Sequence, residues 1–348
     1  MGINIGALLA PIVTQYLAKK VFGIEDMPAY KVVFIAAGVG MLLSLVWFWF
    51  GRRQLQGIGL PAEHQTGMRN VSLVVLFGAV IGIPMFYALL TIDANLLQAI
   101  LMALFVIPAV MLVVEGLREG KVARDKVVAM LVIFVFNVLF WMFFEQAGSS
   151  FNFLADRIVD RNIGMEGFFQ AFAGTSDFPV SWFQSVNSVA IITLAPVIAW
   201  IWVKLGKANP SIPRKFGLGL LFNGAAFALL MLALSSMVVD GKIPFWTLFM
   251  VYVIQSIGEL CLSPIGLSMT TKLAPSRLAG MAMGCWFLSI AIGNNMAGIF
   301  AGKVSGEGGM TVESALKGYT FGFWALIISG VVLFLVAPLI NKLMHGVK

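Results

Sequence analysis

The sequence has few charged residues. Asp, Glu, Lys and Arg make up 11% of its 348 residues, against about a quarter in soluble globular domains. Hydrophobic residues make up 60%. A membrane-spanning helix needs roughly 20 mostly apolar residues, and such stretches recur along the whole chain. The composition therefore excludes a soluble domain and predicts an integral membrane protein, with a helical bundle favoured over a barrel of short alternating strands.

Histidine and cysteine are also scarce. His64 lies in a polar segment and His345 at the C-terminal end, so neither can relay a proton within the membrane. Cys261 and Cys285 lie in apolar segments, where a thiol behaves as a small hydrophobe, and no disulfide framework is implied. The sequence has no P-loop signature, metal-ligand cluster or nucleophile–base pair. We therefore expect neither an ATP-driven pump nor an enzyme, with no catalytic residues and no metal or other cofactor.

Ten apolar stretches are candidate membrane spans. They cover residues 2–18, 31–50, 71–91, 95–115, 127–152, 182–204, 215–238, 244–271, 279–302 and 319–341. The polar segment of residues 52–70 between the second and third, with three glycines and a proline, is predicted to be a linker between bundles. The longest predicted loop runs from Asp156 to Pro179.

The distribution of basic residues predicts the orientation. If the spans alternate in direction, 15 Lys and Arg residues fall on one side of the membrane and eight on the other. By the positive-inside rule the richer side is cytoplasmic, which places the C-terminus in the cytoplasm. The formal charge of +7 is spread over short loops and forms no single patch, so topology explains it better than a nucleic-acid partner does.

Two carboxylates interrupt the apolar stretches. An ionisable group inside a span costs about 2.5–3.5 kcal/mol on insertion scales and normally faces a cavity or a partner. Glu145 lies toward the outer end of the fifth span, and Glu259 lies near the centre of the eighth. Polar or small residues share the helical face of Glu259: Tyr252, Gln255, Ser256, Ser263, Gly266 and Thr270. We expect this stripe to face water or a polar ligand.

Glu145 has a shorter stripe, and other spans add polar or aromatic groups. By helical spacing, Trp141, Gly148, Ser149 and Asn152 share its face. The further candidates are Asn4, Gln184, Asn187, Trp286 and Ser289. Simpler interpretations stay open. The amides could form hydrogen bonds between helices, the tryptophans could only fill space between helices, and Glu145 could pair with a loop cation.

Proline and glycine indicate where helices bend or approach one another. Pro264 removes a backbone hydrogen bond five residues after Glu259, which predicts a bend beside the carboxylate. The pairs Gly280/Gly284 and Gly298/Gly302 predict close helix approach in the ninth span.

Several segments resemble the proton-dependent oligopeptide transporter family of the major facilitator superfamily, in its bacterial type. GINIGALLAPIV, residues 2–13, is similar to the end of that family's FYxxINxGxL signature. FWMFFEQAGSSFNFLADR, SWFQSVNSVAIITLAPVIAWIW, IGELCLSPIGLSMTTKLAPSRLAG and CWFLSIAIGN resemble its seventh, eighth, tenth and eleventh helices. The resemblance implies an all-α helical bundle of the major facilitator type, with about ten transmembrane helices present.

The resemblance also implies a division of the chain. Residues 1–50 correspond to family helices 5 and 6, residues 51–125 to a linker and an extra transmembrane hairpin, and residues 126–348 to the C-terminal six-helix bundle. Family helices 1–4, with the ExxERF motif, have no counterpart. We therefore expect the chain to be an N-terminally truncated fragment that does not transport by itself.

For the whole protein, the resemblance implies a proton-coupled symporter that imports di- and tripeptides by alternating access, acting as a monomer in the bacterial inner membrane. Glu145 would be the proton-coupling carboxylate. The substrate-binding residues would be Asn4, Trp141, Asn187, Glu259, Ser263 and Trp286, with Glu259 at the peptide's amino group. A proton-coupled transporter of another small solute and a non-transporting membrane scaffold are the alternatives.

Overall fold

The computed structural model describes residues 2–23, 28–58, 68–306 and 308–347. The chain forms two compact units, residues 1–13 with 98–348, and residues 14–97. Each unit is described by itself below. The predicted division at residues 50 and 125 stays a prediction, and His64 and most of the predicted linker lie outside the described residues.

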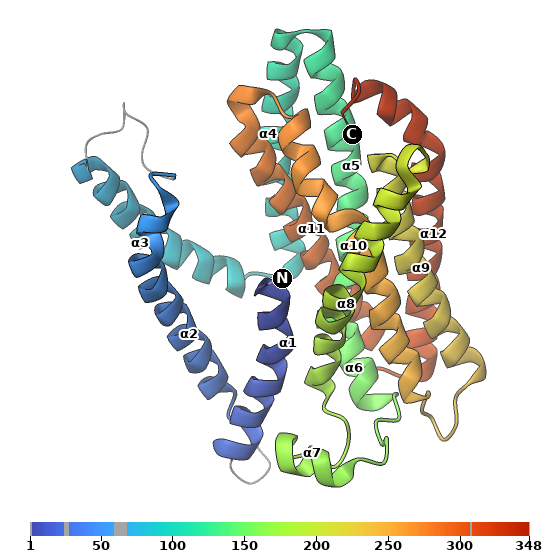
Figure 1. The fold of residues 1–348 in the computed structure, drawn as a ribbon. Coiled ribbons are helices and arrows are strands. Elements are labelled where there is room, and N and C mark those ends of the chain that lie inside the picture. The colour runs from blue at the N-terminus through green and yellow to red at the C-terminus, as the bar shows by residue number, and fades with distance from the viewer. Residues whose placement is uncertain (1, 24–27, 59–67, 307, 348) are drawn as a thin grey trace. The chain divides into compact units, whose positions relative to one another are not determined.

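The described residues form twelve α-helices joined by short segments (Figure 1). They are α1 (Gly2–Gln15), α2 (Tyr30–Gly51), α3 (Met68–Thr91), α4 (Ala94–Glu119), α5 (Lys121–Phe144), α6 (Ser150–Arg157), α7 (Glu166–Ala173), α8 (Phe183–Leu205), α9 (Ile212–Ser236), α10 (Phe245–Leu273), α11 (Ala279–Ser305) and α12 (Val312–Leu343). The only β-structure in these residues is two isolated bridges. The all-α prediction is confirmed.

Nine helical segments of the described chain are long and apolar enough to cross a membrane. They coincide with nine of the ten predicted spans. The predicted first span is helical as α1 and continues as a π-helix, Tyr16–Val21, but it is not among the nine. Its polar residues, including Asn4 and the pair Lys19–Lys20, dilute its apolar character.

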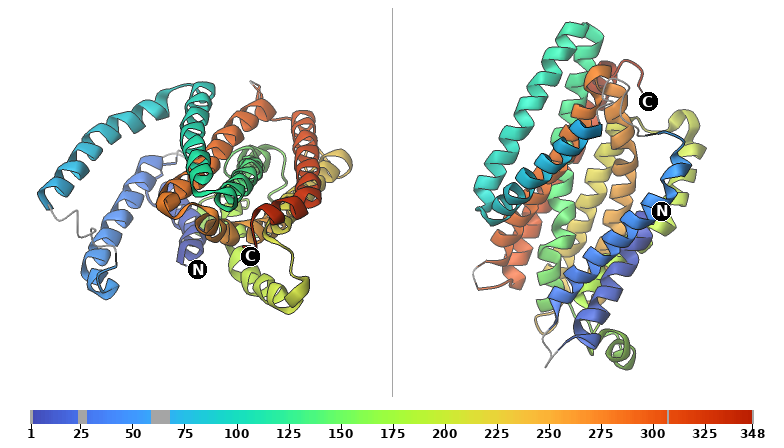
Figure 2. Two further views of the ribbon diagram at one scale, coloured as in Figure 1. Left: turned by 90° about the horizontal axis from the view of Figure 1, so that it is seen from above. Right: turned by 90° about the vertical axis from the view of Figure 1, so that its left-hand side faces the viewer.

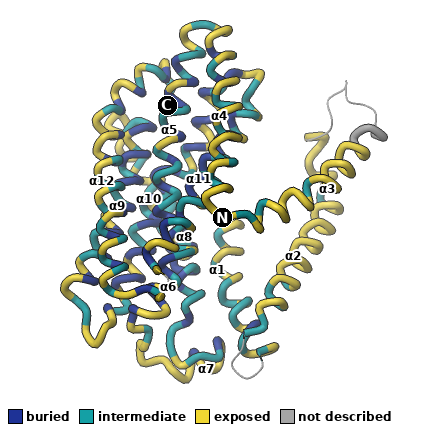
Figure 3. The backbone as a smooth tube through the Cα atoms, turned by 180° about the vertical axis from the view of Figure 1, so that it is seen from behind, coloured by how far each residue is buried: buried dark blue, intermediate teal, exposed yellow. Residues whose placement is uncertain are grey.

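In the unit of residues 14–97, α2 and α3 bury almost nothing within the protein. No described residue of α2 is buried, and Figure 3 shows α2 exposed along its length. Apolar helices without protein neighbours are suited to lipid, where the bilayer replaces a core. The turn that follows α3 ends at Asp93, whose Oδ2 accepts hydrogen bonds from the backbone N–H of Asn95 and Leu96. These bonds, chiefly that of Asn95, lower the pKa of Asp93.

In the unit of residues 1–13 and 98–348, α5 is the central helix. It packs against α9, α10, α11 and α12, and it lies among them when seen from above (Figure 2). Its buried side chains include Ile133, Phe134, Phe140 and Phe143, at helical spacing. The centre of this bundle is therefore aromatic and closely packed.

Glycines allow the closest helix contacts, but they are not the predicted ones. A Cβ on Gly258 would lie 2.8 Å from the Gly219 carbonyl oxygen, where α10 crosses α9. A Cβ on Gly293 would lie 2.8 Å from the Val138 carbonyl oxygen, where α11 crosses α5. By contrast, a Cβ on any member of the predicted pairs, Gly280, Gly284, Gly298 and Gly302, would meet nothing within 4 Å. The prediction of close approach at those pairs was wrong, because they face away from the neighbouring helices.

One further prediction was wrong. The predicted loop 156–179 contains a helix, α7, with Phe169 and Ala173 buried and Phe168 and Phe172 exposed. The helix α10 continues through Pro264, and the predicted bend beside Glu259 stays a prediction.

Gly258→Ala is expected to lower the melting temperature of the purified protein in detergent. The added methyl group has no room beside Gly219, and overpacking of this kind costs typically about 1–3 kcal/mol. Gly280→Ala is the matched control, because its Cβ meets nothing and alanine favours helix. Equal melting temperatures for the two variants would contradict the α9–α10 contact.

Candidate substrate and proton site

The α-helix α5 ends at Phe144, immediately before Glu145. Glu145–Gly148 form a 3₁₀ segment, and Ser149 has φ −132° and ψ −97° before α6 begins. The predicted continuous helix 127–152 was therefore wrong, and so was the shared face of Glu145 and Asn152, since α-helical spacing does not continue past Phe144. The sequence EQAGSS therefore interrupts the helix at membrane depth and frees backbone groups from helical hydrogen bonds.

Gln146 holds this break from inside the bundle. Its side chain is fully buried, and its Nε2 donates to the carbonyl oxygens of Met142 (2.9 Å) and Ala297 (3.2 Å). Its Oε1 accepts from the Ser150 hydroxyl at 2.7 Å, and the Tyr319 hydroxyl donates to the same serine at 3.2 Å. One amide therefore ties the two sides of the break to α11 and, through Ser150, to α12.

The Ala147 carbonyl takes two donors from other helices. Gln184 Nε2 of α8 lies 3.1 Å from this oxygen, and the Tyr252 hydroxyl of α10 lies 3.0 Å from it. In a membrane, where water cannot satisfy a freed carbonyl, such bonds are needed for an interrupted helix. Gln184 thus forms a hydrogen bond between helices. This is the simpler of its two interpretations, the other being a group at a substrate site.

Glu145 stands at this break without a cation. Its side chain is half-buried, and none of the ion pairs among the described residues includes it. Its position at the C-terminal end of α5 faces the negative end of the helix dipole, which disfavours a carboxylate. The alternative of a structural pair with a loop cation therefore has no support in the described residues.

Glu259 has a defined hydrogen-bond partner. Asn187 Nδ2, on α8, donates to Glu259 Oε2 at 3.0 Å and to the Ser256 hydroxyl at 2.9 Å. Glu259 is half-buried on α10, and Gln184, one turn before Asn187 on α8, donates to the Ala147 carbonyl two residues after Glu145. The structure thus brings together Glu145, Glu259 and Asn187, three of the residues predicted from sequence.

Most of the predicted stripe on α10 faces other helices. Gln255 is buried and donates to Asn223 Oδ1 (2.8 Å) on α9 and to the Phe143 carbonyl (3.3 Å) on α5. Thr270 is buried and donates back to the Gly266 carbonyl. The expectation that the whole stripe faces water or a ligand was wrong. Of its members, only Glu259 and Ser263 are half-exposed.

The two tryptophans are joined through a residue that the sequence analysis missed. Trp141 is half-buried, and its indole N–H donates to Asn137 Oδ1 at 3.1 Å. Asn137 is fully buried and donates to the Ser289 hydroxyl (2.8 Å), which donates to the Trp286 carbonyl. A lone Asn in the apolar run LVIFVFNVLF was the available signal.

Trp286 itself is buried, with 2% of its surface exposed. It packs edge-on against Phe134 and Phe216, and its ring fills the space where Gly266 lacks a side chain. In this structure it therefore contacts protein on these sides, and its predicted role at a substrate stays a prediction.

The side chains of Asn4 and Ser263 are half-buried, and neither forms a hydrogen bond with another described residue. Asn4 is less exposed than residues 5–7 and is one turn from Leu8, whose carbonyl accepts from Ser185 of α8 at 2.9 Å. Asn4 therefore lies on the face of α1 that turns to α8. Ser263 follows Glu259 by one turn, and its hydroxyl forms no hydrogen bond in the described chain.

Within the described ranges, no group of three or more His, Cys, Asp and Glu side chains could hold a metal ion. The site therefore consists of carboxylates, amides, hydroxyls and indoles on helices at membrane depth, a composition that suits a polar solute passing through a solute transporter.

Comparison with known proteins agrees with this class. The model of the POT family matches residues 1–314. The uncharacterized transporter YclF of Bacillus subtilis is 31% identical over the whole chain, which covers 67% of YclF. The peptide transporter YePEPT of Yersinia enterocolitica is also 31% identical, and the chain covers 68% of it.

A solved structure shows the same fold. The crystal structure of peptide transporter POT in complex with sulfate matches with a TM-score of 0.74 at 31% identity, covering 99% of this chain and 67% of that one. The chain belongs to the POT family of transporters. Its helical fold is that of the major facilitator superfamily, and it spans about two thirds of the length of these relatives.

The two donors to Ala147 predict a non-additive loss of stability. Tyr252→Phe and Gln184→Leu each leave one donor on the carbonyl, so each is expected to cost about 1 kcal/mol. The double variant leaves it unsatisfied, which costs a further 1–3 kcal/mol, roughly. Melting temperatures in detergent, treated as a double-mutant cycle, measure this excess; strictly additive losses would show that the carbonyl has another partner.

Proposed function

We propose that this chain is part of a proton-coupled symporter that imports di- and tripeptides by alternating access. The observation that carries the proposal is the pair of half-buried carboxylates on helices that meet at Ala147, one without a cation among the described residues and one held by an amide. The names of relatives support the substrate class: dipeptide and tripeptide permease B of Aeromonas hydrophila is 30% identical over 99% of this chain.

Glu145 is the proposed proton-coupling residue. A half-buried carboxylate at a helix break changes its interactions strongly when it gains or loses a proton. Its proposed partners are basic groups of the N-terminal bundle, which pair with the ionised form and release the protonated form as the two bundles rock.

Glu259 is the proposed partner of the peptide's amino group. Its Oε2 accepts from Asn187, which fixes the carboxylate and leaves acceptor capacity for an ammonium group. Asn187 and Asn4 would bond the peptide backbone, and Trp141, Ser263 and Trp286 would line pockets or gates. Contacts to termini and backbone, which all peptides share, would accept many side chains.

We place the protein as a monomer in the bacterial inner membrane with the C-terminus in the cytoplasm. Contacts within residues 98–348 support the assignment of each loop to one side of the membrane or the other. His345 Nε2 lies 3.1 Å from Asp125 Oδ2, and Asn341 Nδ2 donates to Ser211 Oγ at 2.8 Å. Both contacts join segments assigned to the basic, cytoplasmic side. On the opposite side, Val159 pairs with Ile243.

A second substrate class has a specific observation in its favour. A POT family transporter 27% identical to this chain has been solved in complex with 5-aminolevulinic acid, which has an amino group and a carboxylate but no peptide bond. Proton-coupled uptake of another small amino acid-like solute is therefore the alternative.

Glu145→Gln is expected to abolish proton-driven accumulation of dialanine while leaving exchange of dialanine across the membrane. Glutamine keeps the shape but cannot load or release a proton. Uptake and counterflow are measured in vesicles that contain the whole protein encoded by the reading frame to which this chain belongs. Glu119→Gln, at an exposed position on α4, is the control. Normal accumulation by Glu145→Gln would contradict the coupling role.

Glu259→Gln is expected to weaken both accumulation and exchange at least tenfold, because a charge-assisted hydrogen bond to the amino group is worth about 1.5–3 kcal/mol. The pattern differs from that of Glu145→Gln, in which exchange survives. A non-transporting scaffold predicts that dialanine is taken up neither by the wild type nor by any variant.

Competition separates the two substrate classes. Unlabelled dialanine is expected to inhibit uptake of labelled dialanine, and N-acetyl-dialanine is expected to inhibit at least tenfold less, because it has no ammonium group for Glu259. If 5-aminolevulinic acid is transported and dialanine is not, the peptide assignment is wrong and the alternative holds.

A further inference from the structure

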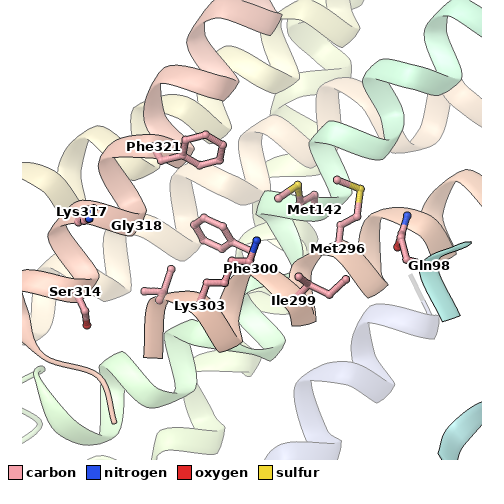
Figure 4. Close-up of a pocket in the computed structure, with 11 residues that line it drawn as sticks. Gln98, Met142, Met296, Ile299, Phe300, Lys303, Ser314, Lys317, Gly318 and Phe321 are labelled. Atoms are coloured by element: carbon pink, nitrogen blue, oxygen red, sulfur yellow. The ribbon is translucent and has the colours of Figure 1, made fainter. Parts of the chain in front are cut away.

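A pocket lies between α11 and α12, outside the proposed substrate site. Its volume is about 770 Å³, within the range of about 300–1,000 Å³ that small-molecule sites have. Neither Glu145 nor Glu259 lines it. Figure 4 shows its walls, which come from α11, α12, α5 and the start of α4.

The walls of this pocket are mostly apolar and belong to membrane-spanning helices. Met296, Ile299 and Phe300 line it from α11, Met142 from α5 and Phe321 from α12. Phe321 is 60% exposed, so the pocket opens to the surroundings of the bundle. An exposed apolar side chain on a spanning helix is suited to lipid.

Two lysines line the pocket at one end. Lys303 is in the last turn of α11 and Lys317 is on the facing helix α12, and both are exposed. Gln98 lies at the other end (Figure 4), where its Oε1 accepts from Asn295 Nδ2 at 2.8 Å. The positive charge is therefore confined to the end of the pocket near the α11–α12 turn.

Neither the Lys303 nor the Lys317 ammonium group forms an ion pair with another described residue. Glu313, one turn before Lys317, forms none with these residues either. The helix dipole favours Lys303 at the end of α11, but it gives no reason for Lys317, which lies beyond the first turn of α12. Two unpaired cations beside an apolar groove complement an anionic amphiphile.

We propose that this pocket binds one anionic phospholipid from the surrounding membrane. The phosphodiester lies between Lys303 and Lys317, and one acyl chain lies against Met296, Phe300 and Phe321. A lysine near a membrane surface attracts anionic lipid by a modest amount, and two lysines on facing helices direct that attraction to one headgroup. The apolar walls supply the hydrophobic contact that a soluble anion cannot use.

The simpler explanation is that each lysine extends to the membrane surface on its own. Independent lysines would attract anionic lipid without a defined stoichiometry, and the shape of the groove would not matter. A site formed by the lysines and the groove together would bind one lipid and would depend on both. The test therefore varies the charge and the groove separately.

Native mass spectrometry of the purified protein, titrated with dimyristoyl phosphatidylglycerol or dimyristoyl phosphatidylcholine, measures the binding. We expect one phosphatidylglycerol per protein, retained in preference to phosphatidylcholine. Lys303→Gln with Lys317→Gln is expected to weaken phosphatidylglycerol binding about 10–30-fold. Lys31→Gln with Lys242→Gln, which removes the same charge on the same predicted side of the membrane, is expected to leave it unchanged.

Met296→Trp tests the groove with both lysines in place. The larger side chain occupies the space of the acyl chain, so the bound phosphatidylglycerol is expected to be lost; Leu335→Trp, at an exposed position of α12, is the control. Unaltered binding in either the paired Gln variant or Met296→Trp overturns the proposal. So does equal binding of phosphatidylcholine, or equal binding of glycerol phosphate, which would indicate a site for a soluble anion.

Discussion

A broken helix in a medium without water sets the main constraint on this structure. The backbone groups freed between Phe144 and Ser150 cannot be left unpaired at membrane depth, since each would cost several kcal/mol, on the order of the penalty for an unsatisfied polar group in hydrocarbon. Gln146, Gln184 and Tyr252 supply the missing bonds. As a result α5, α8, α10 and α11 must meet at this one place.

The same meeting point separates two kinds of polar residue. Those that hold the helices together, such as Gln146, Asn137 and Gln255, are fully buried, and each donates a hydrogen bond to another helix. Glu145 and Glu259 are only half-buried. Burial therefore distinguishes scaffold from site better than polarity does.

The sequence predicted the helical class and the nine recovered spans because both follow from composition and length. It could not predict the break at Glu145, because the donors that stabilise it, Gln184 and Tyr252, lie 37 and 105 residues from Ala147. The glycine contacts failed for a related reason. Gly280 and Gly298 have the expected spacing, but only the neighbouring helix decides that Gly258 and Gly293 are the close positions.

The broken helix also bears on the order in which the protein is made. The ribosome releases Lys121–Arg157 as one apolar stretch before Gln184 or Tyr252 has left the exit tunnel. Without those donors, a continuous helix satisfies more backbone groups in the bilayer than an interrupted one does. We infer that α5 and α6 insert as a single regular helix and that the break forms only after α8 and α10 have joined it, so the carboxylate pair is assembled late in biogenesis.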